Sequence, residues 1–212
     1  MPWESIETEK MGLLFPGWRA YNIKKGGRIV GTVWHHFKTI TKHRHLVMRH
    51  CFQVGLYRRG LCHDLSKYSW TEFRAGVRYY QGTRSPNAAQ REAEGYSTAW
   101  MHHKGRNKHH FEYWTDLLPG TREYGPVSMP TEYLVEMVMD RIAACKVYRG
   151  NAYCDGDALD YLQRAKDSAL MHPQTKEQLR YLLTMLRDQG EKETFRFIRQ
   201  VVLRGKPFGE TV

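Results

Sequence analysis

The chain has 212 residues, of which 41% are hydrophobic and 13% aromatic, so it can bury one sizeable core and is not a disordered chain. No apolar run approaches the roughly 20 residues that span a bilayer, and the acidic start MPWESIETEK fits neither a secretory signal nor a transit peptide, so we expect a cytoplasmic protein without membrane contact. The net charge of +11 at pH 7 favours a phosphorylated small molecule or nucleotide as ligand, with nucleic acid as a further possible partner. The simpler alternative is a basic surface without a dedicated ligand.

Helical periodicity and capping signals predict short helices in the first half of the chain. Residues 1–28, with the pair Gly26-Gly27, should form an irregular arm, whereas the polar stretch 83–95 and the Pro- and Gly-rich stretch 116–130 should be loops. The predicted helices span about residues 38–57, 61–68, 69–82, 98–103 and 107–114. Gly105 should interrupt the fourth of them and Asn107 should be the N-cap of the fifth.

The second half of the chain contains the clearest predicted helix, at residues 131–149, with Gly150 as its terminator. Further helices are predicted at about 157–170, 174–188 and 191–203. No segment alternates with period two between turn signals, so we expect an all-α fold without a sheet. A single domain should comprise the arm of residues 1–28, a metal-binding helical core of residues 29–150 and C-terminal helices in residues 151–212 packed on that core. The oligomeric state stays open.

Most of the eleven histidines lie between residues 35 and 110, and imidazole is the most common metal ligand in proteins. His43, Val47 and His50 share one face of a predicted helix, so His43 can point into the bundle. His63 and Asp64 are neighbours, about 100° apart around a helix axis. They could each take one of two metal ions or hold one ion between them. Two polar residues that happen to be adjacent are the simpler interpretation of the pair alone.

Further candidate ligands follow along the chain. His103 and His110 bracket the basic stretch KGRNK, with His109 as the alternative to His110, and a solvated basic surface is the simpler interpretation for each of them. Asp140 lies on an apolar face of the 131–149 helix, where a carboxylate is costly unless it is paired or metal-bound. A salt bridge from Asp140 to an arginine is the structural alternative.

In order, these candidates give the pattern H…HD…H…H…D, which resembles the HD-domain superfamily. That resemblance implies a helical bundle with a metal site between its helices, in metal-dependent phosphohydrolases and, in a minority of members, diiron oxygenases. The segments HDLSKYSWTEF, AWMHHKGRNKHHFEYW, MPTEYLVEMVMDRIAA and AKDSALMHPQT also resemble, in order and spacing, the domain of unknown function 5662, a family of phages and bacteria, over roughly residues 40 to 178. This second resemblance places ligands on His43, His103 and Asp140 and implies no known activity. It departs at Arg141, where the family often has Trp. A phage-encoded protein would act in the cytoplasm of the host.

Histidines and carboxylates without a thiolate suit one or two divalent ions of Mn, Fe, Co, Ni or Zn. Lys67 falls where HD-domain enzymes with the HD-x-x-K form place a lysine near the substrate phosphate, and an ion pair of Lys67 with Asp64 or Glu72 is the alternative. Arg106 and Lys108 could add phosphate contacts, and Arg106 offers a bidentate fork. Glu72 is either the capping-box partner of Ser69, which we favour, or a carboxylate that orients a ligand histidine. His172, just before a proline, should be structural.

The sequence therefore predicts a metal-dependent phosphohydrolase that acts on a nucleotide or another small phosphoester through an activated water. Its catalytic residues would be Lys67, Asp64 and Arg106. An HD-type diiron oxygenase, or a non-catalytic basic module that binds nucleic acid or protein and holds a structural metal, are the alternatives. The candidate metal ligands are His43, His63, Asp64, His103, His109, His110 and Asp140.

Overall fold

The computed structural model describes residues 26–164 and 170–208. Over these ranges the fold is mostly helical, which confirms the predicted all-α class. No described helix combines the length and the hydropathy that crossing a membrane requires. The α-helices are α3 (Gly26–Val54), α4 (Tyr57–Cys62), α5 (Trp70–Arg78), α6 (Pro86–Glu94), α7 (Thr98–Arg106), α8 (Thr131–Arg149), α9 (Asp157–Arg164) and α10 (Pro173–Gln200). Short 3-10 helices are η2 (Leu65–Tyr68), η3 (Phe111–Tyr113), η4 (Gly150–Ala152) and η6 (Val202–Arg204).

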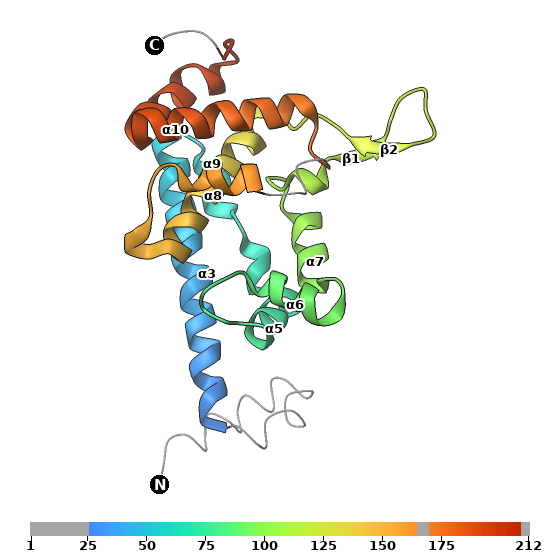
Figure 1. The fold of residues 1–212 in the computed structure, drawn as a ribbon, viewed down its shortest axis with the longest axis vertical. Helices are drawn as coiled ribbons and strands as arrows, with labels where there is room; N and C mark the ends of the chain where they lie inside the picture. Colours follow the sequence, from blue (N-terminus) through green and yellow to red (C-terminus); the bar gives the residue numbers. More distant parts are fainter. Residues whose placement is uncertain (1–25, 165–169, 209–212) are drawn as a thin grey trace.

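Helix α8 runs through the centre of the hydrophobic core. Every residue from Leu134 to Met139 is buried, including the charged Glu136. Val47 and Cys51 of α3 belong to the same core, and Figure 1 shows α10 lying across the carboxyl-terminal end of α3. Because α3, α9 and α10 all pack on α8, its polar side chains are enclosed and need partners inside the protein.

Helix α3 is longer than predicted. It begins at Gly26 and not near residue 38, so it includes the last residues of the predicted arm, while residues 1–25 lie outside the described residues. Its first half exposes Trp34 and Phe37, whose stacked rings lie 5.8 Å apart. The apolar spacing that marks a buried helix face is therefore weak in this half, which explains the late predicted start.

Helix α6 occupies the stretch 83–95 that was predicted as a loop. The Ser85 hydroxyl accepts a hydrogen bond from the Asn87 backbone N–H, Pro86 takes the first helical position, and Gly95 ends the helix at a φ of 81°. These are ordinary start and stop signals of a helix. The loop prediction was wrong because it followed the polar composition of the stretch.

A two-stranded antiparallel hairpin of β1 (Thr115–Leu117) and β2 (Tyr124–Pro126) contradicts the expectation of no sheet. Each strand has only three residues, and those of β1 are all exposed. Such strands are too short to produce a pattern of alternating burial in the sequence. The hairpin projects away from the helices (Figure 1).

Several helix ends also differ from the predictions. Gly105 lies inside α7, and Asn107 is the C-cap of that helix, not the N-cap of the next. The helices predicted at 174–188 and 191–203 are joined in α10 across a kink at Gly190, whose φ is 78°. The helix predicted at 157–170 is described to Arg164, and residues 165–169 lie outside the described residues. His172 has the predicted structural role, since its Nδ1 accepts a hydrogen bond from the backbone N–H of Gln174 at the start of α10.

Helix α5 packs on α3 through Gly76, and this contact yields a stability prediction. A Cβ at Gly76 would lie 2.2 Å from Nε2 of His36, which is held beside Phe73 and Tyr80. We expect Gly76→Ala to lower the free energy of unfolding by about 1–3 kcal/mol through this overlap. Urea unfolding followed by circular dichroism measures the change.

Gly105 provides the matched control for Gly76. It also lies inside a helix, but a Cβ there would meet no atom within 4 Å. Gly105→Ala should therefore be neutral or stabilise the protein by up to about 1 kcal/mol. The double variant Gly76→Ala/His36→Ala should recover part of the loss if the imidazole causes it, and a Gly76→Ala protein more stable than the parent would contradict the close contact.

Candidate metal centre

The turn between α4 and η2 positions the His63-Asp64 pair. Helix α4 approaches α3 closely at Gly60, where a Cβ would lie 2.9 Å from the Cβ of Cys51. Arg44 of α3 donates hydrogen bonds to the backbone carbonyls of Leu61 and His63. Asp64 has a φ of 54° and is the one residue other than glycine with a positive φ among those described. This left-handed conformation costs a non-glycine residue roughly 1–2 kcal/mol, and backbone strain of this kind is common at functional sites.

Five separate segments of the chain bring the predicted ligands together. Helix α3 contributes one histidine, the turn after α4 the His-Asp pair, α7 one histidine, the segment after α7 two histidines, and α8 one aspartate. Across the centre, Nε2 of His43 lies 2.9 Å from Oδ1 of Asp140. The structure therefore gathers all seven candidates, namely His43, His63, Asp64, His103, His109, His110 and Asp140.

The candidates form two groups of four that share Asp64, and the ligand atoms within each group lie within 4.8 Å of one another. Oδ2 of Asp64 lies 3.6 Å from Nε2 of His43 and 3.2 Å from Nε2 of His63. Oδ1 lies 3.3 Å from Nε2 of His103 and 3.5 Å from Nε2 of His109. Each carboxylate oxygen thus faces a different group, as a carboxylate shared by two ions would. The first group is His43, His63, Asp64 and Asp140, and the second is Asp64, His103, His109 and His110.

Six atoms at the centre of this cluster are buried and make no hydrogen bond of ordinary geometry to another described group, although Oδ2 of Asp64 is paired with Lys67 and Nε2 of His43 lies close to Asp140. They are the Nε2 atoms of His43, His63, His109 and His110 and both carboxylate oxygens of Asp64. Buried polar atoms are nearly always satisfied in folded proteins, so six such atoms that face one another call for a ligand. Imidazole nitrogens and carboxylate oxygens fit a divalent transition metal ion.

Glu136 of α8 orients one histidine of each group. Its Oε1 lies 2.9 Å from Nδ1 of His63 and 3.2 Å from Nδ1 of His109, so both rings can donate to it. With Nδ1 protonated, the Nε2 atom of each ring is left with its lone pair directed at Asp64. Burial alone would raise the pKa of Glu136, but the hydrogen bonds from the two histidines outweigh it and lower the pKa to about 2. Glu136 is therefore a carboxylate at neutral pH.

Glu72 of α5 has a similar role beside the second group. Its two carboxylate oxygens lie 2.7 Å from Nδ1 of His102 and 2.8 Å from Nδ1 of His103. The Ser69 side chain makes no capping hydrogen bond, although Ser69 is the N-cap residue of α5. The favoured capping-box interpretation of Glu72 was therefore wrong, because the glutamate turns toward the histidines.

The charges of the site keep Asp64, Asp140 and His110 in metal-binding forms. Burial alone would lower the pKa of His63, but the nearby carboxylates of Asp64, Asp140 and Glu136 raise this pKa well above its usual value, so a metal ion would have to displace a proton there. Burial alone would raise the pKa values of Asp64 and Asp140. Nearby His63 and Lys67 outweigh burial for Asp64, and the imidazole of His43, 2.9 Å away, outweighs it for Asp140, so both pKa values lie well below the usual range. Burial, and then the charges of neighbouring histidines, lower the pKa of His110 well below its usual value. Ionised carboxylates and neutral imidazole are the forms that coordinate a metal.

Lys67 and Arg106, two of the predicted phosphate ligands, differ in placement. Nζ of Lys67 lies 2.5 Å from Oδ2 of Asp64, so the ion pair considered as the alternative is present. The Lys67 side chain is 27% exposed, which places its ammonium group at the edge of the buried cluster. Arg106 is the last residue of α7 and is exposed, and no hydrogen bond or ion pair joins it to the candidate ligands in the described part of the chain.

Substitution of Glu136 tests its orienting role. Glu136→Gln keeps the shape, but a neutral amide oxygen accepts the two ring N–H groups more weakly than a carboxylate oxygen does, and its NH2 group replaces the oxygen that pairs with Arg59. We expect the affinity for transition metal ions to fall by about 10- to 100-fold, as is typical when a carboxylate that orients a histidine ligand is removed. Competition with a chelator of known affinity measures the change.

Glu132→Gln is the control for Glu136→Gln. Glu132 lies one helical turn earlier in α8, and both glutamates pair with Arg59. Glu132, however, is half exposed and faces no candidate ligand. Its substitution should leave the metal affinity within about twofold of the parent, since surface ion pairs contribute little. Equal losses in both variants would show that Arg59, and not the histidine contacts, explains the effect.

Comparison with known protein families matches residues 32–185 to a family of unknown function (DUF5662). The match covers well over half of the chain. The chain belongs to this family. The DUF5662 segment contains all seven candidate ligands together with Glu72, Glu136 and Lys67, whereas the second half of α10 lies beyond it. No curated protein and no solved structure matches the chain significantly.

Proposed function

We propose that the protein is a metal-dependent phosphohydrolase of HD-domain type that acts on a nucleotide or another small phosphoester. The observation that carries this proposal is the pair of four-ligand groups on either side of Asp64, with six buried ligand atoms that make no ordinary hydrogen bond to another described group. Two ions that share a carboxylate are a recurrent arrangement in enzymes that hydrolyse phosphoesters.

The proposed HD-domain-like architecture is a helical bundle with the metal site between its helices and extra helices at the carboxyl terminus. Its support is the order of the ligands along the chain and their origin in α3, α7, α8 and the turns after α4 and α7. The core of this architecture would comprise residues 29–150, with residues 151–212 packed on it.

Two divalent ions, when bound, would supply positive charge for the phosphoryl oxygens and a water of lowered pKa as the nucleophile. The residues of the chain would hold and complement this chemistry. Lys67, as the partly exposed cation beside Asp64, would contact a phosphoryl oxygen of the substrate as a point charge. The histidines tied to Glu136 and Glu72 would keep a fixed tautomer and orientation.

Metal analysis followed by a hydrolysis panel tests this proposal. The purified protein is loaded in turn with Mn, Fe, Co, Ni and Zn, and its metal content is measured before assays on nucleoside mono-, di- and triphosphates and on a bis-aryl phosphodiester. We expect up to two ions per chain and release of phosphate or of an alcohol from at least one substrate.

The other outcomes separate the alternatives. Oxygen consumption by the iron-loaded protein, with no hydrolysis under any metal, would favour the diiron oxygenase. A full complement of metal without either reaction would leave a structural site. A protein that binds no transition metal ion on titration would rule out both enzymes.

A further inference from the structure

The first third of the chain has an unusual charge distribution. From residue 10 to residue 63 there is no aspartate or glutamate, so the first carboxylate after Glu9 is the one at Asp64. Helix α3 lies within this stretch and has several lysines and arginines with no acidic residue in its 29 positions. A helix of this length usually carries charges of both signs, so its surface attracts anions along its whole length.

Four polar residues of α3 form one exposed stripe, which we call the α3 stripe: Lys38, Lys42, Arg49 and Gln53. At 100° per residue their side chains fall within about 60° of arc, turned away from the buried His43. The stripe is straight and about 22 Å long at 1.5 Å per residue. No carboxylate pairs with Lys42 or Arg49 among the described residues, so these charges are available to a partner.

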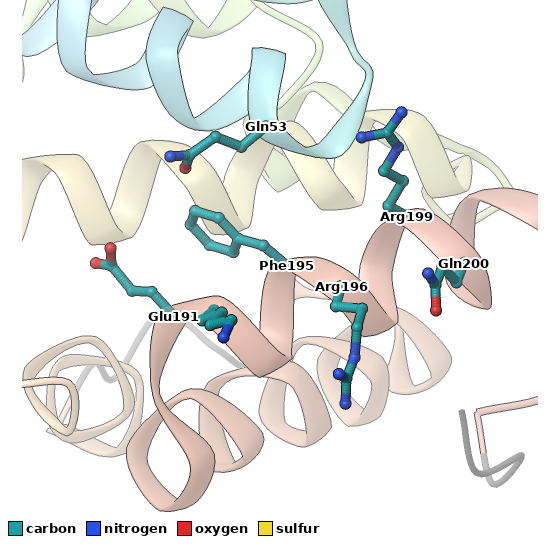
Figure 2. A pocket seen from close by; sticks show the side chains of 7 residues that line it. Gln53, Glu191, Phe195, Arg196, Arg199 and Gln200 are labelled. Carbon is teal, nitrogen blue, oxygen red and sulfur yellow. The ribbon is translucent and has the colours of Figure 1, made fainter.

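The α3 stripe leads into a groove between α3 and the second half of α10. The groove has a volume of about 530 Å³, and Gln53 of the stripe lies on its α3 side. Figure 2 shows Arg199 reaching from α10 toward α3, whereas Arg196 points away from Gln53 and pairs with Glu193. Phe195 is only 6% exposed, and the accessible lining of the groove consists more of apolar than of polar atoms. Contacts to phosphates would therefore come from the charged ends of Lys192 and Arg199. The other lining residues are Glu191, Lys192 and Gln200.

We propose that the α3 stripe and this groove bind the sugar-phosphate backbone of a nucleic acid. The stripe, three cations and one amide over about 22 Å, can follow one strand over about six nucleotides, at 3.4 Å for each step. Arginine, lysine and amide side chains are the usual contacts to backbone phosphates. This surface lies on the α3 and α10 helices, outside the metal ligands, so the proposal stands independently of the proposed hydrolysis.

A nucleic acid fits this surface better than a folded protein does. Interfaces between proteins concentrate aromatic anchors and are depleted of charge at their centre. The members of the α3 stripe are all polar, although the exposed Trp34 and Phe52 lie beside it on α3, and the one aromatic ring of the groove lining is almost covered. Contacts to phosphates alone carry no base readout, so we expect binding without strong sequence preference.

Fluorescence anisotropy with labelled 20-nucleotide probes tests the proposal on the full chain. Duplex DNA, single-stranded DNA and single-stranded RNA are titrated between 50 and 200 mM salt. About four phosphate contacts predict a slope of log affinity against log salt near −3.6 for a duplex, or a loss on the order of 100-fold over this range. The charge reversal Lys42→Glu/Arg49→Glu/Arg199→Glu should flatten this slope by about three and weaken binding on the order of 100-fold.

The matched control reverses three exposed arginines elsewhere, in α6, in the β-hairpin and in α9, and changes the net charge by the same amount. These substitutions are Arg91→Glu, Arg122→Glu and Arg164→Glu, and binding should stay within a few-fold of the parent. Neutralisation by Lys42→Gln/Arg49→Gln/Arg199→Gln is the second test variant should the reversal impair folding. An equal loss in the control would overturn the proposal, because net charge alone would then explain binding.

Three further measurements decide the identity of the partner and the surface. If poly-glutamate or vesicles rich in an anionic lipid bind through Lys42, Arg49 and Arg199 more tightly than the oligonucleotides do, the choice of nucleic acid as the partner is overturned. Binding should also persist in an Asp64→Asn background, where the metal centre is impaired. A loss of binding there would place the nucleic acid at the metal centre and refute the α3 stripe.

Discussion

Asp64→Asn is expected to remove metal from both ligand groups and to abolish most of the hydrolysis. Asp64 is the one residue that belongs to both groups of four, and its amide analogue offers a single neutral oxygen in place of two charged ones. Charge stabilisation by a catalytic metal contributes several kcal/mol, so activity should fall on the order of 1,000-fold. Elemental analysis of the purified variant, compared with the parent, measures the metal lost.

Thermal unfolding provides a second readout that does not depend on activity. A ligand that binds only the folded state at 100 times its dissociation constant stabilises it by about 2.7 kcal/mol per site. The parent should therefore melt at a higher temperature when metal is added, and Asp64→Asn should not. Asp116→Asn, at an exposed carboxylate of β1, is the control and should respond as the parent does. Two equivalents of metal retained by Asp64→Asn would refute the shared role of this carboxylate.

Lys67→Ala is expected to leave the metal content unchanged and to lower kcat by about 100- to 1,000-fold. This range is typical of the loss of one group that stabilises charge in the transition state. The ammonium group lies 2.5 Å from Oδ2 of Asp64, so its removal takes away a cation that competes with the metal ion. Metal affinity should therefore be equal to or higher than that of the parent. Steady-state kinetics on the metal-loaded variants, with metal content measured in the same samples, separates the two effects.

Lys108→Ala is the matched control for Lys67→Ala. Lys108 was also a predicted phosphate contact and adjoins the candidate ligand His109. It is exposed, lies near the rings of Tyr113 and Tyr133 and forms no ion pair with Asp64. Its substitution should change kcat by less than about threefold, as is usual for an exposed charge. A Lys67→Ala protein that loses its metal would assign Lys67 a purely structural part in the cluster, and one that keeps full kcat would exclude it from the phosphate site.

The histidine and aspartate candidates could be predicted because residue type alone restricts them. Few structural roles suit a histidine in helical spacing with an apolar stripe, such as His43, or an aspartate on an apolar face, such as Asp140. The structure brings both residues to one centre. The choice between His109 and His110 could not be made from spacing. The structure places both in the second group, since the segment between α7 and η3 is irregular there.

Glu136 could not be predicted, because its partners lie far away in the sequence. The segment LVEMVM shows one polar residue in an apolar run, and its hydrogen bond to His63 joins residues 73 positions apart. Glu72 had a local explanation, a capping box, which a sequence favours over a partner 30 residues away. Helix α6 was missed for the opposite reason, since its local caps were present but were outweighed by polar composition.

At residue 64 the left-handed backbone conformation and the proposed metal binding favour different amino acids. Glycine adopts this conformation without steric cost and asparagine tolerates it well, so a library randomised at residue 64 and sorted for thermal stability without metal should enrich glycine and asparagine. The same library sorted for metal retention should return aspartate alone. Residue 64 is thus a position where a designer who optimises stability would delete the function, the usual trade-off at strained sites.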